Sequence, residues 1–281
     1  MPSVTIIGIG RVGGALEIAF RGSEYRVQML IRRDSTGKSQ LDEIERISTD
    51  IVIIATPDGA ITNVAASLAG KVAGRPIVLH TSGALSSGEL AVLAVAGCPT
   101  ASMHPLVSIS SPEIGAKRFA GAYFCVEGDE RGVSAANAIV RSLGGVSFQI
   151  PAANKALYHA SAVTACGHVT ALIEMAFSMM NRAGVDHELS VKILSPLIRS
   201  TIDNIEEQGT AAALTGTFAR ADKDGLRRQL ASFEGKLSDE ELEIFLDLAG
   251  LSLKLAKRQG VNEKKVADVN ELISMAKSNL R

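Results

Sequence analysis

Short apolar runs alternate with amphipathic segments over the first half of the chain. Runs rich in Val and Ile predict strands at residues 3–7, 26–31, 50–55, 76–80, 122–126 and 146–150, with a weaker candidate at 99–103. Between these runs, apolar positions recur with the period of a helix. This alternation predicts an α/β fold with a mostly parallel sheet and helices on both faces.

The strand pattern stops near residue 150, and the rest of the chain predicts helices alone. Residues 154–183 are rich in Ala, Met and Leu and apolar on most sides, which predicts one long helix at the centre of a helical domain or of a dimer. Ser238 and Glu241 form an S-x-x-E capping box at the start of a later helix. We expect an α/β domain at residues 1–151 and an all-α domain at 152–281. Further helices are predicted at 186–208, 222–235, 238–259 and 262–280.

Composition narrows the class of protein. With 46% hydrophobic residues, 21% charged residues and a net charge of −1, the chain does not resemble a partner of nucleic acid or of an anionic membrane. Three widely spaced cysteines (Cys98, Cys125 and Cys166) lie in apolar runs and are predicted to be small buried side chains in a reducing compartment. The sequence has no Cys-x-x-Cys or His/Cys cluster for a metal, no signal-peptide pattern, and no uninterrupted apolar run approaching the ~18 residues of a membrane span. We expect a cytoplasmic enzyme.

A glycine-rich turn follows the first predicted strand. Gly8-Ile-Gly10-Arg11-Val12-Gly13 matches G-x-G-x-x-G and leads directly into a predicted helix, which is the context that gives this pattern meaning. The first glycine permits a tight turn, the second lets a pyrophosphate approach the backbone, and the third lets helix and strand pack closely. The free N–H groups of the helix then favour phosphate. The segment predicts a Rossmann dinucleotide-binding domain.

Two arginines end the second predicted strand, where an NAD site expects a carboxylate for the ribose 2′-hydroxyl. Arg32 and Arg33 suit a 2′-phosphate through charge-assisted bidentate hydrogen bonds and stacking on adenine. We therefore expect NADP(H). NAD(H) is the alternative, because Asp34 could face the ribose in a shifted register; the arginine pair could also be a solvated strand end.

Polar residues also follow the third and fourth predicted strands. Thr56-Pro57-Asp58 lies where open α/β sheets bind ligands, although Thr56 or Asp58 could instead cap the next helix. His80-Thr81-Ser82-Gly83 brings an imidazole, two hydroxyls and a flexible backbone to the same edge. We expect the hydroxyls to contact cofactor or substrate, and His80 could equally be structural.

Three further residues are candidates for catalysis. His104, at the end of the weaker strand candidate and before a proline, could act as a general acid or bind a carbonyl; a packed loop histidine is the alternative. Lys155 and His159 are spaced i, i+4 and share a face at the start of the long predicted helix. We expect these two side chains to contact a small-molecule substrate, although a lone helical histidine is more often structural. We expect His168 and His187 to be structural.

These segments together resemble a family of Rossmann-like NADP oxidoreductases with a C-terminal helical domain of unknown function. The resemblance covers nearly the whole chain and rests on GIGRVGGAL, HTSGALS, MHPL, LYHASAV, PLIRSTIDNI and ALTGTFARAD. It implies an architecture like that of 6-phosphogluconate dehydrogenase, pyrroline-5-carboxylate reductase and ketopantoate reductase, with a helical dimerisation domain. Lys155 and His159 are similar to the Lys-x-x-x-Asn pair of the β-hydroxyacid dehydrogenases. Thr217 and Ala221 depart from the family, which usually has Pro and Gly at these places.

We expect an NADP(H)-dependent oxidoreductase that transfers hydride to or from a small carbonyl, hydroxyl or imine substrate. His159 would donate or accept the proton, while Lys155 and His104 bind or polarise the substrate oxygen. Two alternatives remain open: a non-catalytic NADP(H)-binding sensor dimer, and a reductase that uses a deazaflavin as hydride partner. In each case we expect a homodimer formed through the helical domain.

Overall fold

The computed structural model describes residues 1–32 and 39–280, and the chain divides into two compact units, Met1–His168 and Val169–Arg281. Arg33, Asp34 and Ser35 lie outside the described residues. The last strand ends at Phe148, and only helices follow it in the described chain. The helical residues up to His168 nevertheless belong to the first unit, because they pack on the sheet.

In the described part of the first unit, seven strands form one sheet in the order β2-β1-β3-β4-β5-β6-β7. Neighbouring strands are parallel except for β5 and β6. The predicted fold class is confirmed, and the weak strand candidate at 99–103 is a full strand of the sheet. The strands are β1 (Ser3–Ile7), β2 (Arg26–Ile31), β3 (Ile51–Ile54), β4 (Ile77–His80), β5 (Thr100–Pro105), β6 (Tyr123–Gly128) and β7 (Val146–Phe148).

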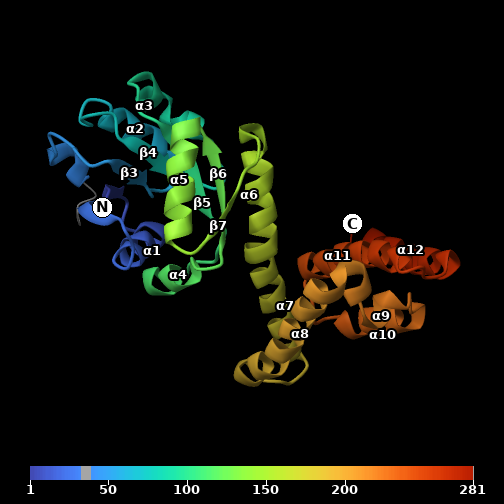
Figure 1. The fold of residues 1–281 in the computed structure, drawn as a ribbon. Coiled ribbons are helices and arrows are strands. Elements are labelled where there is room, and N and C mark those ends of the chain that lie inside the picture. The colour runs from blue at the N-terminus through green and yellow to red at the C-terminus, as the bar shows by residue number, and fades with distance from the viewer. Residues whose placement is uncertain (33–38, 281) are drawn as a thin grey trace. The chain divides into compact units, whose positions relative to one another are not determined.

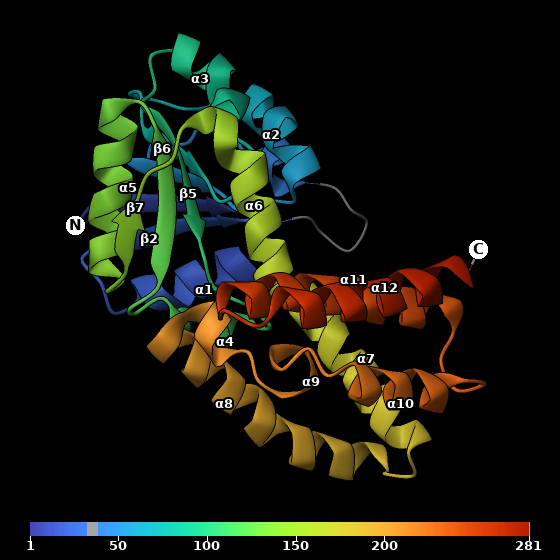
Figure 2. The same ribbon diagram turned by 90° about the vertical axis from the view of Figure 1, so that its right-hand side faces the viewer.

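Helices cover both faces of this sheet (Figures 1 and 2). On one face, buried residues of α1 and α5 pack with Phe119, which follows α4; on the other face, α2 and α3 form a second apolar core. The interior strand β3 is buried on both faces, which explains its unbroken apolar sequence. The helices are α1 (Arg11–Phe20), α2 (Ile61–Leu68), α3 (Ala91–Val95), α4 (Pro112–Arg118), α5 (Glu130–Ser142) and α6 (Lys155–Val163).

The predicted long helix at 154–183 is present as one helical stretch, residues 152–182, but it contains a π-helical turn. After α6 the backbone forms a π-helical turn, Thr164–His168, before α7 continues to Arg182. Such a wide turn has no simple sequence signature, and it is frequent at functional sites. It also places Cys166 on the surface, so the expectation that all three cysteines are buried was wrong for this one.

Residues 152–182 form a helix in the described chain that is long and apolar enough, by length and composition, to cross a membrane. No part of its most apolar window is buried within the chain. The expectation that the chain has no such stretch was wrong, because Ser, Thr and Gly interrupt the apolar residues of this helix without adding charge. A single helix of this kind is weak evidence for a membrane span, because apolar helices of proteins outside membranes can have the same length and composition.

The second unit consists of helices in its described residues. Leu246, Leu253 and Val269 belong to its core, which α11 and α12 build together with side chains of α10. The capping box of Ser238 and Glu241 is present at the start of α11. The helices are α7 (Val169–Arg182), α8 (His187–Ala213, with a non-helical kink at Gly209), α9 (Gly216–Ala219), α10 (Lys223–Phe233), α11 (Asp239–Arg258) and α12 (Glu263–Ser278).

Candidate active site

The glycine turn joins β1 to α1 with very close backbone contacts. Gly8 has φ +95°, and a Cβ there would lie 2.7 Å from the carbonyl oxygen of Ala55. A Cβ on Gly13 would lie only 2.0 Å from the oxygen of Gly8. At Gly10, by contrast, a Cβ would meet no atom within 4 Å, so the backbone here borders open space. These are the three conditions that a phosphate-binding turn requires.

The first turn of α1 is open to an anion. Gly10 is the N-cap residue, no side chain caps the helix, and no acidic residue lies in its first turn. The N–H groups of Arg11, Val12 and Gly13 therefore lack partners from a cap, and the helix dipole adds partial positive charge. This arrangement fits a pyrophosphate.

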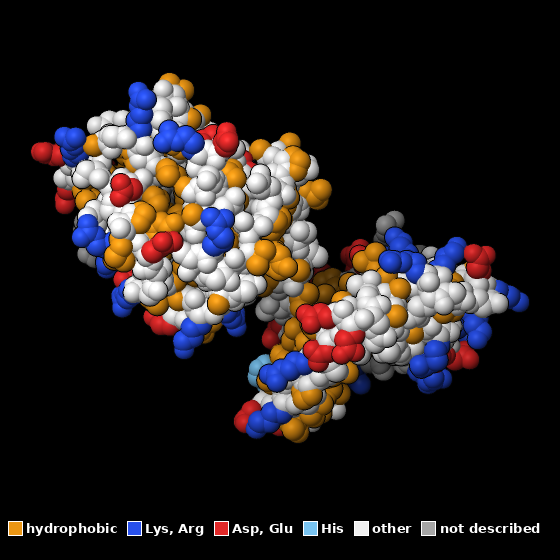
Figure 3. All heavy atoms as spheres, in the orientation of Figure 1, with side chains coloured by type: hydrophobic (Ala, Val, Ile, Leu, Met, Phe, Trp, Pro, Cys, Tyr) orange, Lys and Arg blue, Asp and Glu red, His pale blue; other side chains and the backbone are white. Residues whose placement is uncertain are grey.

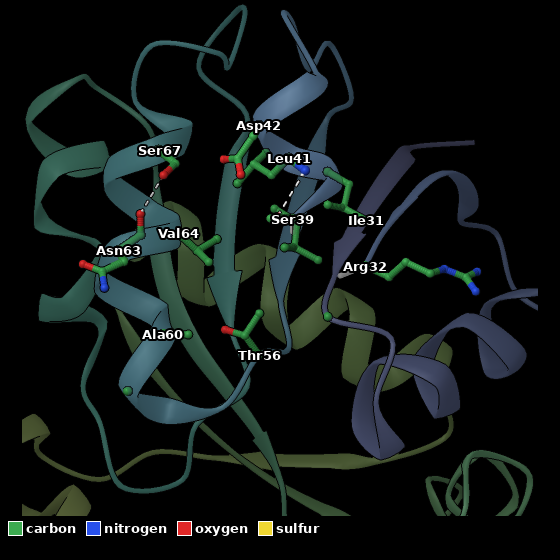
Figure 4. Close-up of a pocket in the computed structure, with 13 residues that line it drawn as sticks. Ile31, Arg32, Ser39, Leu41, Asp42, Thr56, Ala60, Asn63, Val64 and Ser67 are labelled. Carbon is green, nitrogen blue, oxygen red and sulfur yellow. Dashed lines mark hydrogen bonds between the residues drawn. The ribbon is translucent and has the colours of Figure 1, made fainter. Parts of the chain in front are cut away.

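A cavity of about 260 Å³ lies beside this turn, between the ends of β1 and β2 and helix α2 (Figure 4). Arg32 extends from the end of β2, and its side chain is exposed, so its guanidinium is free to meet a phosphate. Asp42 and Asn63 contribute polar groups that the sequence did not single out. The cavity is lined by Ile7, Gly8, Ile31, Arg32, Ser39, Leu41, Asp42, Thr56, Gly59, Ala60, Asn63, Val64 and Ser67.

Thr56 follows β3 and lines this cavity and the next one along the sheet edge. Its hydroxyl is buried and has no hydrogen-bond partner among the described residues. Neither Thr56 nor Asp58 caps α2, whose N-cap residue is Ala60, so the capping alternative is not what the structure shows. A buried hydroxyl without a partner costs free energy, and a bound nucleotide would supply the missing hydrogen bond.

The loop after β4 is held by His80, whose side chain is fully buried. The Ser82 backbone N–H donates to Nδ1 of His80 at 3.2 Å, which leaves Nε2 to donate to the Ser86 carbonyl at 2.9 Å. Burial lowers the pKa of His80, which favours this neutral form. The ring therefore shapes the loop, as the structural alternative predicted.

Lys155 is buried to 1% exposure although it was expected to face a substrate. Its ammonium group donates to the carbonyl oxygen of Ser82 at 3.1 Å and to the hydroxyl of Ser102 at 2.8 Å. Ser102 in turn donates to the same carbonyl at 3.2 Å. Burial lowers the pKa of Lys155. These bonds fasten the start of α6 to the loop after β4.

Two histidine rings converge beside this loop. The rings of His104, at the end of β5, and His159, on α6, are 6.0 Å apart between centroids. A Cβ on Gly83 would lie 2.8 Å from Nε2 of His104 and 2.6 Å from Cδ2 of His159. Only glycine lets both rings approach so closely. Burial, and then the positive charge of Lys155, lower the pKa of His104 to about 3.

The two histidines line two adjoining cavities. The first, about 420 Å³, runs from the glycine turn past Thr56, Pro57 and Asp58 to Thr81, Ser82 and Gly83. The second, about 950 Å³, is lined by α6, the π-helical turn and the segment after β5. Its lining residues are Arg11, His104, Pro105, Leu106, Val107, Ser108, His159, Ser161, Ala162, Val163, Ala165, Cys166 and Gly167.

The structure therefore brings together most of the predicted site. All of the predicted cofactor residues in the described chain lie at the turn or along these cavities except Gly13, which packs beneath the turn, and His104 and His159 meet as expected. Lys155 is close but faces the sheet. Sequence reasoning missed the role of Tyr158, whose hydroxyl is 2.7 Å from Nδ1 of His104. In the described residues no group of three His, Cys, Asp or Glu side chains is placed to hold a metal.

Comparison with known sequences places this geometry in context. Residues 2–105 match the model of a Rossmann-like domain, and residues 122–274 match a domain of unknown function (DUF2520). No curated protein matches the sequence significantly.

Solved structures with the same fold span nearly the whole chain. Protein TM1727 from Thermotoga maritima is 24% identical, with 91% of this chain and 99% of that chain covered and a TM-score of 0.68. A reductive aminase from Aspergillus terreus, in complex with NADPH and ethyl levulinate, is 16% identical over 95% and 99% of the chains, with a TM-score of 0.59. A pyrroline carboxylate reductase from Plasmodium falciparum, with NADP bound, is 16% identical over 95% and 98%, with a TM-score of 0.56.

Proposed function

Because the chain belongs to the family that carries the domain of unknown function DUF2520 behind a Rossmann-like domain, we propose that it is an NADP(H)-dependent oxidoreductase. Its substrate would be a small molecule with a carbonyl, hydroxyl or imine group. One observation carries the proposal. His104 and His159 converge on Gly83, where the cavity of about 420 Å³ that runs from the glycine turn adjoins the larger cavity of about 950 Å³. A nucleotide-binding protein without chemistry has no need of two imidazoles at that junction.

The cofactor assignment rests on the fit of the residues present. The open backbone at Gly10 and the uncapped start of α1 would hold the pyrophosphate, and the unpartnered hydroxyl of Thr56 would gain a hydrogen bond. The exposed guanidinium of Arg32 suits a 2′-phosphate, which favours NADP(H) over NAD(H). The reductive aminase and the pyrroline carboxylate reductase are solved with NADPH and NADP respectively.

When bound, the nicotinamide supplies or accepts the hydride. The protein must hold the substrate and manage one proton. His104 would donate a hydrogen bond to the substrate oxygen, and His159 would give or take the proton. Lys155 would act as a positioning residue, because its ammonium group is committed to Ser82 and Ser102 and it lines neither cavity.

Cofactor choice can be tested separately from catalysis. Replacing Arg32 by Glu removes a charge-assisted phosphate contact of about 1.5–3 kcal/mol, which is roughly a 10–100-fold rise in the Kd for NADPH. Binding of NADH should hardly change. Arg26→Glu, an exposed arginine at the other end of β2, is the matched control and should leave both Kd values unchanged. Equal loss for NADPH and NADH in Arg32→Glu would contradict the NADP assignment.

Catalysis is tested with a panel of small keto acids, hydroxy acids, aldehydes and cyclic imines, followed by the change in nicotinamide absorbance. Turnover with a member of the panel, reduced at least 100-fold in His159→Gln at unchanged NADPH affinity, supports the proposal. Saturable NADPH binding without turnover of any member favours the sensor alternative. Full activity in His159→Gln removes that residue from the mechanism.

The assembly is a further part of this proposal. Leu189, Ile193 and Leu197 are exposed at intervals of four residues along α8, and Leu157 on α6 is 75% exposed. Figure 3 shows hydrophobic side chains on the surface where α7 and α8 lie. Lys192 pairs with Glu188 elsewhere on α8, so this helix is amphipathic. An exposed apolar stripe such as Leu189, Ile193 and Leu197, flanked by charged residues, is typical of a helix that packs against another protein chain. We propose that a second copy of the chain covers it.

Oligomeric mass gives the test of this assembly. Light scattering at micromolar concentration should give twice the mass of the chain, and Leu197→Glu should shift the population to the monomer. A monomer mass for the unaltered protein would remove the dimer from the proposal.

A further inference from the structure

Tyr158, on α6, contacts two residues of the sheet, His104 of β5 and Phe148 of β7. Its hydroxyl is 2.7 Å from Nδ1 of His104, and the two rings meet edge to face with centroids 5.6 Å apart. On its other side the ring packs against Phe148 at 5.9 Å, and the ammonium of Lys155 lies 5.9 Å from its centroid. The phenol is therefore held in position independently of the histidine it touches.

The direction of this hydrogen bond follows from the partners available. The Tyr158 hydroxyl has no second hydrogen-bond partner among the described residues. If Nδ1–H of His104 donated to it, the phenolic proton would remain unpaired in a half-buried site. If the hydroxyl donates to Nδ1, its proton is satisfied and the imidazole must carry its own proton on Nε2. The second arrangement moves the one donor without a partner from the phenol to Nε2 of His104, which lines both cavities and can donate to a ligand there.

The protonation states agree with this direction. Burial raises the pKa of the Tyr158 phenol, so it keeps its proton. The pKa of His104 is lowered to about 3 by burial and by the positive charge of Lys155, so the ring carries a single proton. A hydrogen bond to the other ring nitrogen is a common means by which proteins fix a histidine tautomer.

The other ring nitrogen of His104, Nε2, lies beside Gly83, where the two cavities adjoin. Nε2 of His104 has no partner among the described residues, and it adjoins Gly83 on the wall that both cavities share. On the Nε2–H tautomer this position offers a donor and no acceptor. A carbonyl or alkoxide oxygen accepts from such a donor. The protonated imine, which is the form that readily takes up hydride, has no lone pair on its nitrogen and cannot accept.

We propose that Tyr158 is a positioning residue that fixes His104 as the Nε2–H tautomer, so that His104 is a constant neutral donor to a substrate oxygen while His159 exchanges the proton. This inference rests on the proposed function and deepens it. It assigns the substrate to the carbonyl and hydroxyl class, and not to the imines. No proton leaves His104 during the reaction.

The experiment uses the full chain labelled with ¹⁵N-histidine, whose five histidines give a small set of ring signals. In the unaltered protein, the ring assigned to His104 should show an unprotonated Nδ1 and a protonated Nε2 at neutral pH. In Tyr158→Phe, which keeps the aromatic packing, the two tautomers should mix. Tyr123→Phe is the matched control, because Tyr123 also packs against Phe148 but is exposed and has no hydrogen bond to His104.

Kinetics supplies the second readout. Loss of a residue that orients a reacting group typically costs roughly 10–100-fold, which we expect in kcat for Tyr158→Phe with the Kd for NADPH unchanged. Tyr123→Phe should retain kcat. Carbonyl substrates should turn over and cyclic imines should not.

Three results would overturn the inference: an Nδ1–H tautomer in the unaltered protein, an unchanged tautomer in Tyr158→Phe, or efficient turnover of cyclic imines. Failure of the proposed function is distinguishable from these. It would appear as a correct tautomer and NADPH binding without turnover of any substrate, because the ring signals do not depend on activity.

Discussion

Acidification should destabilise the first unit through His104 in a way that can be calculated. The pKa of His104 is lowered from 6.5 to about 3, first by burial and then by the positive charges of Lys155, His159 and His80. In the unfolded chain the ring regains its ordinary pKa. The folded state then binds fewer protons than the unfolded state between about pH 6.5 and pH 3.

The sign and size of the change in the free energy of unfolding with pH follow from this difference in bound protons. Above pH 6.5 the ring is neutral in both states and contributes no pH dependence. Below it, each pH unit lowers the free energy of unfolding by about 1.4 kcal/mol, until protonation of the folded state begins near pH 3. Moving from pH 7 to pH 4.5 should therefore cost roughly 2–3 kcal/mol through His104 alone. The lowered pKa of His80 acts in the same direction.

The assay is urea unfolding at pH 7 and pH 4.5, followed by tyrosine fluorescence. The chain has three tyrosines and no tryptophan, and Tyr25, Tyr123 and Tyr158 all lie within Met1–His168, so this signal reports the first unit. In His104→Gln the acid-induced loss should be smaller by about 2–3 kcal/mol than in the unaltered protein. His187→Gln, at an exposed histidine of α8, is the control and should show the unaltered loss.

Equal losses of stability for His104→Gln and the unaltered protein would refute the reasoning. So would a proton NMR signal of His104 that titrates near the ordinary histidine value. The second measurement is decisive because it reads the same group directly and does not depend on how the two units unfold.

Three substitutions test other parts of the site and fold. Gly83→Ala places a methyl 2.6 Å from His159 and 2.8 Å from His104, so turnover should fall at least about 100-fold, with a stability loss of about 1–3 kcal/mol by urea unfolding. Thr56→Val removes a buried hydroxyl without a partner, so it should raise the stability of the free protein by about 1 kcal/mol while weakening NADPH binding about tenfold in a titration; loss of both would contradict the assignment. Ala221→Gly should raise the melting temperature by about 2–4 °C, because Ala221 has φ +45°; a lower melting temperature would count against strain there.

The elements and the dinucleotide turn were predictable because their signals are local. Apolar strands, the glycines at positions 8, 10 and 13 and the capping box at Ser238 each depend on residues within a few positions of one another. The resemblance marked Ala221 only as a departure from the family pattern; the positive φ of this residue is a finding of the structure.

The orientation of the side chains at the candidate site was not predictable in the same way. Helical spacing correctly places Lys155 and His159 on neighbouring positions of α6, but it does not say that the ammonium turns into the sheet. That outcome depends on Ser82 and Ser102, which are 73 and 53 residues away. The bond between Tyr158 and His104 likewise spans 54 residues, and no local pattern marks it.

The buried Lys155 and the absent side chain of Gly83 have a common consequence for the site. A buried ammonium is costly unless its protons find acceptors, so Lys155 holds α6 where the Ser82 carbonyl and the Ser102 hydroxyl can receive them. With α6 held there, His159 is pressed against the loop, and only a residue without a Cβ fits between it and His104. Two features therefore set the distance between the two imidazoles: the hydrogen bonds of Lys155 to Ser82 and Ser102, and the lack of a Cβ at Gly83. A site built this way is held in place before any ligand binds, and the proposed reaction would need this, because it must align a substrate with two histidines.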